Sequence, residues 1–260
     1  MIDPLMFIAL LPAVVLVVYI CRKDRTDKEP PALIAKLLGY GVLSCLPAIV
    51  VELILSAIIE RLNVRNVCLG YFLEAFVVAG LTEETCKFLF LRTTWRSPAF
   101  DYQFDAIVYA VMVALGFAAF ENVKYVYSYG FATGIVRAVT AVPGHAIFGV
   151  FMGYFYGYAK LSDYWGRDDD RKAYLALSVV VPVLMHGCYD FLAFTQESDS
   201  RFTLLFYAYL VALYVFGIRR VNRSSRDDRR VTRETVFDYF RRMQYPMPPQ
   251  YRDRNDDFWR

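Results

Sequence analysis

The chain has 260 residues, of which 57% are hydrophobic, 17% aromatic and 21% charged, and its mean hydropathy is +0.32. A soluble domain is about 45–50% apolar, whereas the excess here is gathered in seven blocks, several of which approach 20 residues with few or no charges. This pattern excludes a soluble globule, a coiled coil, a disulfide-stapled secreted domain and a disordered chain. Since about 20 apolar residues cross the hydrocarbon core as a helix, the blocks predict an all-α, polytopic bundle in the cell membrane.

The net charge of +3 lies in one tail, because residues 219–260 hold twelve Arg against seven Asp and Glu. We therefore expect the lipid bilayer, and no nucleic acid, as a partner. The five cysteines are dispersed without a CxxC pair, which favours reduced thiols over a disulfide framework or a sulfur metal site.

About seven transmembrane helices are predicted. The first has no positive region before it and is followed by Arg22, Lys23, Arg25 and Lys28, which argues against a signal peptide. In chain order the predicted spans are 3–20, 33–59, 71–91, 104–127, 134–159, 173–194 and 202–218.

The basic residues between the spans predict the orientation. Taken together, the segments after the first, third, fifth and seventh spans hold more Lys and Arg than the alternate loops do. The positive-inside rule then places the N-terminus outside and the C-terminus in the cytoplasm. We expect a membrane-embedded helical domain at 1–220 and an Arg-rich cytoplasmic tail at 221–260. Residues 231–243 fit an interfacial helix or a solvated tail equally, and 244–260 should be disordered.

Ionisable side chains inside spans are costly and therefore mark functional candidates. The third span contains Glu83, Glu84 and Lys87, and the lysine is within i,i+3 or i,i+4 reach of both carboxylates. Because adjacent helix positions differ by about 100°, we expect both glutamates to face one spot only if one acts through water or a further contact. A buried Glu–Lys pair that fixes packing is the structural alternative.

Further polar residues lie in the next three spans. The fourth carries Glu121 and Asn122. An ion pair between Glu121 and Lys124 is the structural alternative to a functional role of the glutamate. The fifth carries His145 on the same stripe as Gly149, Gly153 and Gly157, which predicts a face that packs closely against another helix. An interhelical hydrogen bond of this histidine is the structural alternative.

The sixth span has His186 and Asp190 at i,i+4, so the carboxylate can orient the imidazole. A satisfied buried His–Asp pair is the structural alternative. These two histidines, His145 and His186, are the only ones in the chain. Their coincidence with intramembrane carboxylates on neighbouring helices favours a site over four unrelated pairs.

The motifs Glu83-Glu84-Thr-Cys-Lys87, Phe117-Ala-Ala-Phe-Glu121-Asn122, the His145 glycine helix and His186-Gly-Cys-Tyr-Asp190 resemble, in this order, the PrsW family of membrane-embedded proteases. That family is distantly related to the type II CAAX prenyl endopeptidases. The resemblance covers about residues 70–195 and implies an intramembrane endopeptidase. It further implies site-1 cleavage of a membrane-anchored substrate, such as an anti-sigma factor, on the extracytoplasmic side.

No Ser-His-Asp or Cys-His set is evident, which favours water as the nucleophile. A buried glutamate can act as the general base, and Glu83 is preferred slightly over Glu84. Glu121, His145 and His186 would hold the water or a metal, and a His₂Glu set is a catalytic zinc site. A metal-free glutamate mechanism is the alternative to zinc. Asp190 would orient His186, and Lys87 or Asn122 would stabilise the oxyanion.

Two other classes of function compete with a protease. Chains of Glu, His and Asp also relay protons in coupled transporters, but the inverted repeats expected there are not evident. A non-catalytic scaffold or receptor would keep the same packing. Cleavage of a single-span test substrate distinguishes these classes.

Overall fold

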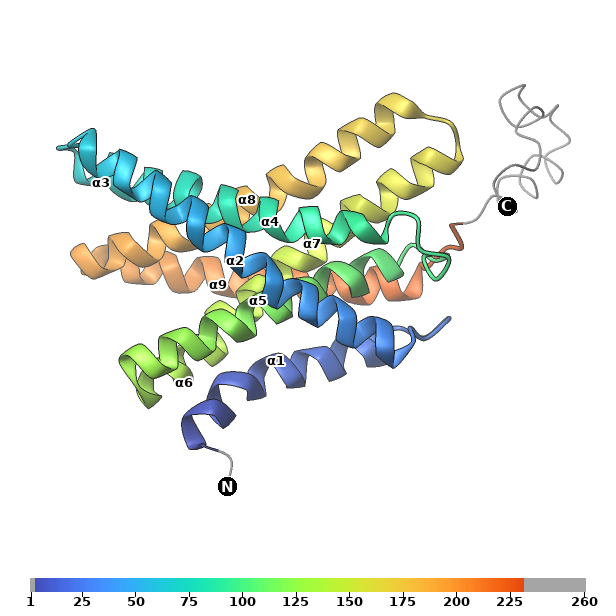
Figure 1. The fold of residues 1–260 in the computed structure, drawn as a ribbon, viewed down its shortest axis with the longest axis horizontal. Helices are drawn as coiled ribbons and strands as arrows, with labels where there is room; N and C mark the ends of the chain where they lie inside the picture. Colours follow the sequence, from blue (N-terminus) through green and yellow to red (C-terminus); the bar gives the residue numbers. More distant parts are fainter. Residues whose placement is uncertain (1–2, 232–260) are drawn as a thin grey trace, which may run out of the picture.

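The computed structural model describes residues 3–231, and this part of the chain is a bundle of helices without a strand (Figure 1). The predicted all-α class is therefore confirmed. In chain order the elements are α1 (Pro4–Lys23), α2 (Pro31–Arg61), α3 (Val67–Phe72), the π-helical η1 (Leu73–Leu81), α4 (Thr82–Leu91), η2 (Arg92–Thr94), α5 (Asp105–Tyr129), α6 (Phe131–Val139), α7 (Ala141–Tyr164), α8 (Asp168–Ser198), η3 (Ser200–Phe202) and α9 (Thr203–Arg226).

Six helical stretches among the described residues are long and apolar enough to cross a membrane. The third predicted span is not among these six. It is a seventh helical run, because α3, η1 and α4 follow one another without a break from Val67 to Leu91. Figure 1 shows this run passing from one end of the bundle to the other. The observed bundle therefore agrees with the predicted seven crossings.

The structure corrects the fifth predicted span. Residues 134–159 are not one helix, because the backbone turns at Thr140 (φ −122°, ψ −71°) and separates the short α6 from α7. The seventh span also runs further than expected, since α9 continues to Arg226 and crosses the predicted domain boundary at 220. The predictions for residues 232–260, an interfacial helix and a disordered end, lie outside the described residues.

The two ends of the described chain lie at opposite ends of the bundle (Figure 1), as an odd number of crossings requires. The basic connections gather at the C-terminal end. There Ser225, near the end of α9, donates a hydrogen bond to the carbonyl of Lys23 at the end of α1. In the segment after α9, the carbonyl of Arg229 accepts a hydrogen bond from the Gln103 amide. This common end is the one that the positive-inside rule assigns to the cytoplasm.

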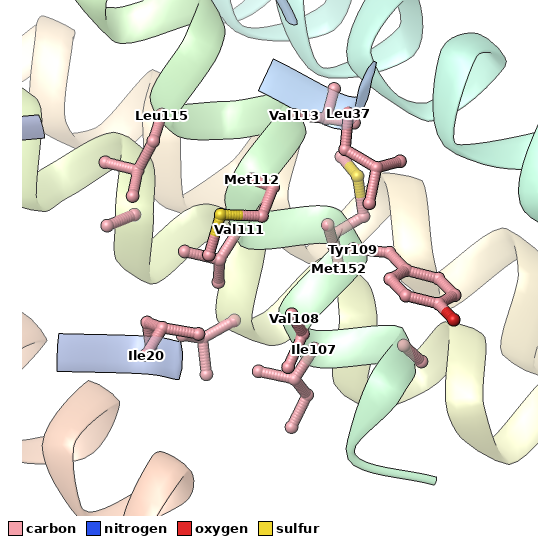
Figure 2. Packing of buried hydrophobic residues seen from close by; sticks show 14 of the residues in the cluster. Ile20, Leu37, Ile107, Val108, Tyr109, Val111, Met112, Val113, Leu115 and Met152 are labelled. Carbon is pink, nitrogen blue, oxygen red and sulfur yellow. The ribbon is translucent and has the colours of Figure 1, made fainter. Parts of the chain in front are cut away.

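Helix α5 forms the core of the bundle. Every residue from Asp105 to Ala118 is buried, as expected for a helix that is apolar on all sides. Figure 2 shows Ile107, Val111 and Met112 of this helix packed with Ile20 of α1 and neighbouring side chains. Helices α4, α6 and α7 pack directly on this central helix, whereas α8 packs on α7 and η1.

Glycines allow two helices to approach α5 closely. A Cβ on Gly41 of α2 would lie 2.1 Å from the carbonyl oxygen of Val113, and one on Gly153 of α7 would lie 2.3 Å from that of Ala106. Gly149 and Gly157 also face α5. The predicted glycine stripe is therefore confirmed as a packing face, and it holds α7, with His145 near its N-terminal end, against α5.

Candidate metal centre

Four buried side chains converge from three helices. Glu83 and Glu84 lie on α4, His145 on α7 and His186 on α8, and one donor atom from each lies within 4.8 Å of all the others. Across residues 3–231 this is the one group of at least three such side chains found so close together. The predicted convergence of carboxylates and imidazoles from separate spans is confirmed.

The ammonium group of Lys87 lies inside this cluster. Its Nζ is 2.7 Å from Oε1 of Glu84, 3.1 Å from Oε2 of Glu83 and 3.0 Å from Nδ1 of His145. It also lies over the Phe117 ring, 4.1 Å from the centroid. A cation is thus already accommodated between the carboxylates and the imidazoles.

The sequence predicted that Glu83 and Glu84 would face one spot only if one of them acted through water or a further contact, whereas both carboxylates contact the Lys87 ammonium directly. The physical reason lies in the side chains. Lys87 follows Glu83 by four residues and Glu84 by three, so its stem runs between them. The rotatable bonds of each glutamate then cover the remaining angle, and no water is needed to join them.

Each of the two imidazoles is held by a carboxylate at its Nε2 atom. His145 has Nε2 2.9 Å from Oε2 of Glu121 and turns Nδ1 toward the cluster. His186 has Nε2 3.2 Å from Oδ2 of Asp190, and its Nδ1 lies 3.0 Å from Oε1 of Glu84. A carboxylate on one ring nitrogen fixes the tautomer and leaves the other nitrogen for the site. Asp190 therefore lies where the sequence predicted it.

The position of Glu121 differs from that of the four clustered groups. It is not among the donor atoms that lie within 4.8 Å of one another. Its Oε2 contacts the far nitrogen of His145 and also the Arg137 guanidinium, at 2.9 Å in each case. Its ion-pair partner among the described residues is thus Arg137, whereas Lys124 was the partner considered from sequence.

Asn122 lies away from the cluster, although it follows Glu121 directly. Its amide nitrogen donates to the carbonyl of Ala9 on α1, and its amide oxygen accepts from Nε of Arg137. The side chain is fully buried by these contacts. Arg137 itself was missed from sequence, although a charge inside the predicted span 134–159 was a signal that could have found it.

The backbone around α4 explains why Glu84 and His186 meet. The π-helical η1 ends directly before Thr82, so the two glutamates lie in the first turn of α4. Helix α8 packs closely against η1 through glycines, since a Cβ on Gly187 would lie 2.3 Å from the ring of Phe76. π-Helical segments are rare and occur mostly near functional sites.

Aromatic rings enclose the imidazoles. Phe148 stacks on His186 with a centroid distance of 5.0 Å, and the two histidine rings meet edge to face at 5.1 Å. Phe117 lies against His145 at 5.8 Å. These contacts restrict the rotamers of both histidines and exclude bulk water from their faces.

The donor set fits a metal ion. Oε2 of Glu84 is buried and has no hydrogen-bond partner, so its lone pairs are free for a cation. Two neutral imidazoles with a carboxylate are the ligands of a catalytic zinc site, which keeps a fourth position for water. Glu121 and Asp190 contact the Nε2 atoms of the two histidines, so the Nδ1 atoms, which here contact Lys87 and Glu84, are the ones that would bind a metal.

Comparison with known proteins agrees with this site. Residues 29–218 match the family described as PrsW family intramembrane metalloprotease. A protein named Protease PrsW from Bacillus subtilis is 34% identical over 214 residues, 82% of this chain and 92% of the relative. The Protease PrsW from Oceanobacillus iheyensis is 34% identical over 82% of this chain and 93% of the relative. The one from Clostridioides difficile is 28% identical over 87% of this chain and 94% of the relative. No solved structure matches. The chain is a multi-pass membrane protein that belongs to the PrsW family of intramembrane metalloproteases.

Proposed function

We propose that this protease cleaves a membrane-anchored protein near the extracytoplasmic face of the membrane, as in site-1 cleavage of an anti-sigma factor. The observation that carries the proposal is the convergence of two carboxylates and two imidazoles in a buried cluster inside the bundle. The N-out orientation expected from the basic loops supports the outer side, because His145 is the fifth residue of α7, near the end of that helix remote from the basic connections.

The exposure of the polar side chains also supports access from that side. Glu121 and Asp190 are 20% and 17% exposed, whereas the side chain of Glu84 is fully buried and that of Lys87 is 1% exposed. Exposure therefore decreases from the carboxylates behind the histidines toward the lysine. Water and an extended substrate segment would reach the cluster past Glu121 and Asp190.

The metal we propose is zinc, with His145, His186 and Glu84 as its ligands. When bound, zinc acts as a Lewis acid toward the attacking water and the peptide carbonyl. Glu84 is preferred to Glu83 as the ligand because it contacts Nδ1 of His186 and has one oxygen without a partner. This assignment replaces Glu121, the carboxylate proposed from sequence, since Glu121 contacts the far nitrogen of His145.

Glu83 is then the general base. Its side chain is the more exposed of the pair, at 9%, so it has the better access to water. A carboxylate in this position accepts a proton from water and returns it to the leaving amine. Lys87 offers its positive charge to the oxyanion, while Glu121 and Asp190 orient the two histidines. Asn122, whose amide atoms both have partners, is assigned to the support of Arg137 and not to the oxyanion.

The test uses purified protein in detergent or proteoliposomes with a single-span, anti-sigma-like substrate. The wild type should cut the substrate on the extracytoplasmic side, zinc removal should stop cleavage, and Glu83→Gln should stop it while zinc remains bound. Cleavage by the wild type and Glu83→Gln alike would contradict the assigned base. Absence of cleavage under all metals tested would instead favour the scaffold or receptor.

A further inference from the structure

Arg137 on α6 belongs to none of the four sequence motifs, yet it is joined to the site through Glu121. We infer that Arg137 is a positioning residue of the protease, which holds Glu121 against Nε2 of His145 and so presents Nδ1 of that histidine to the metal. The inference rests on the ligand set proposed above. Arg137 acts on the metal ligand His145 through Glu121 and does not touch the substrate.

Glu121 lies between His145 and Arg137. Its Oε2 lies 2.9 Å from His145 and 2.9 Å from Arg137, so the same oxygen joins the imidazole and the guanidinium. The carboxylate can orient His145 only while it remains at this point. The Arg137 side chain is 14% exposed, and a partly buried charge pair of this kind holds its geometry better than an exposed one.

Three side chains of α5 hold Arg137 in position. Besides the pair with Glu121, its Nε donates to Oδ1 of Asn122 at 3.1 Å, and its guanidinium lies 3.9 Å from the centroid of the Tyr125 ring. Asn122 is in turn fixed by its bond to the carbonyl of Ala9 on α1. The guanidinium is thus oriented by three side chains of α5, one of which is anchored to α1, before any metal binds.

An arginine can make all of these contacts at once, whereas a lysine cannot. The planar guanidinium donates from Nε and from NH2 in fixed directions and stacks on an aromatic face at the same time. A lysine offers one compact charge and could reach Glu121 only by giving up Asn122 or Tyr125. The break at Thr140 has a function in this arrangement, because it frees α6 to run beside α5 and α1 while α7 continues with His145.

The experiment compares Arg137→Met, Arg137→Lys, Glu121→Gln and the double variant Glu121→Gln/Arg137→Met. Zinc affinity is measured by chelator competition, and kcat/KM is measured with the single-span substrate. Stability is measured by thermal melting in detergent. The matched control is Arg171→Met, which removes another arginine ion pair between two helices, to Asp163 at 3.5 Å, away from the site.

Arg137→Met should weaken zinc binding and lower kcat/KM by about 10- to 100-fold each, the usual loss when a residue behind a metal ligand is removed. Arg137→Lys should recover part of both losses. The double variant should be no worse than Glu121→Gln alone, because Arg137 acts through Glu121 and the effects then do not add. Arg171→Met should leave zinc affinity unchanged.

A structural role of Arg137 would give a different result. Additive losses in the double variant, or a lower melting temperature with unchanged zinc affinity in Arg137→Met, would overturn the inference. His145→Ala separates this failure from failure of the proposed ligand set. If His145→Ala binds zinc like the wild type, the ligand set is wrong; if it loses zinc while Arg137→Met does not, only the positioning role is wrong.

Discussion

Nζ of Lys87 lies 3.0 Å from Nδ1 of His145, in the space between the donor atoms that a metal would share. The same ammonium is the counter-ion of Glu83 and Glu84. Two buried carboxylates without a positive charge would be strongly destabilising. Lysine and metal therefore neutralise the same pair of carboxylates, and their contributions to stability should depend on each other.

Lys87→Met should show this dependence. In the presence of a chelator the variant should be less stable by about 3–5 kcal/mol, the usual cost of removing one partner of a buried ion pair. Zinc should restore more stability to the variant than to the wild type, because it replaces the missing charge. Thermal melting in detergent with and without zinc measures the difference.

Lys160→Met is the control for this prediction. Lys160 is also buried, but its Nζ donates to the carbonyl of Trp95 and lies among aromatic rings instead of carboxylates. Its substitution should lower stability by the same amount with and without zinc. An equal zinc effect in the two variants would show that Lys87 and the metal do not share the carboxylates.

The adjacent glutamates should separate into two roles. Glu83→Gln should lower kcat by about 10²- to 10⁴-fold, the contribution of a general base, and keep its zinc. Glu84→Gln should lose zinc affinity, because the fully buried carboxylate has contacts to Lys87 and His186 and an oxygen free for the metal. Zinc content and single-turnover cleavage distinguish the two. Equal zinc loss in both variants would mean that both glutamates are ligands.

Two glycines of α2 provide a test of the packing. A Cβ on Gly41 would lie 2.1 Å from the carbonyl oxygen of Val113, whereas one on Gly39 would meet nothing within 4 Å. Gly41→Ala should therefore destabilise the protein by about 1–3 kcal/mol through overpacking. Gly39→Ala should be neutral or slightly stabilising, because alanine favours a helix. Detergent melts of the two variants measure this, and similar effects would contradict the close α2–α5 approach.

The orientation in the membrane can be tested with a cysteine of the chain. Cys68 is the one exposed cysteine among the described residues, in α3 at the end that the basic loops assign to the outside. A membrane-impermeant maleimide should label it in intact cells. Asp168→Cys in a Cys68→Ala background, at the start of α8, should react only after permeabilisation. Labelling in the reverse order would invert the predicted topology.

Much of the site was predictable because its spacings are local. Glu84 with Lys87, and His186 with Asp190, are pairs on single helices, so the helical period determines that they meet. Convergence of these pairs followed from the cost of intramembrane charge. The apolar blocks likewise determined the spans, since bilayer thickness fixes their length.

The features of the site that were not predicted depend on tertiary contacts, which local residue spacing does not reveal. Thr140 breaks an apolar stretch that reads as one helix, so α6 was not separated and Arg137 was not matched to Glu121. The π-helical η1 has no distinct composition. Glu121 was assigned to the metal because its helix position gives no information on which nitrogen of His145 it contacts. Each of these points depends on how α6 and α7 pack against α5 and how α8 packs against α7 and η1.

The acidic residues between α1 and α2 predict a pH dependence outside the spans. Burial raises the pKa of Asp24 to about 6, and burial likewise raises the pKa of Glu29 to about 7. Asp228 and Asp27 also raise the pKa of Asp24, and Lys28 lowers it. A carboxyl with a raised pKa in the folded state binds more protons there than in the unfolded state. Stability should therefore fall as pH rises from about 4 to about 7 and level off above.

Asp24→Asn removes part of this dependence, because the amide has no charge to desolvate and Oδ1 of Asp24 is buried without a partner. The variant should be more stable than the wild type at pH 8, by at most about 3 kcal/mol for a shift of about two pKa units, and the difference should shrink toward pH 4. Asp27→Asn, at an exposed position of the same loop, should change little. Comparison of variant with wild type at each pH cancels the titration of the buried cluster, so an Asp24→Asn effect independent of pH would contradict the assigned cause.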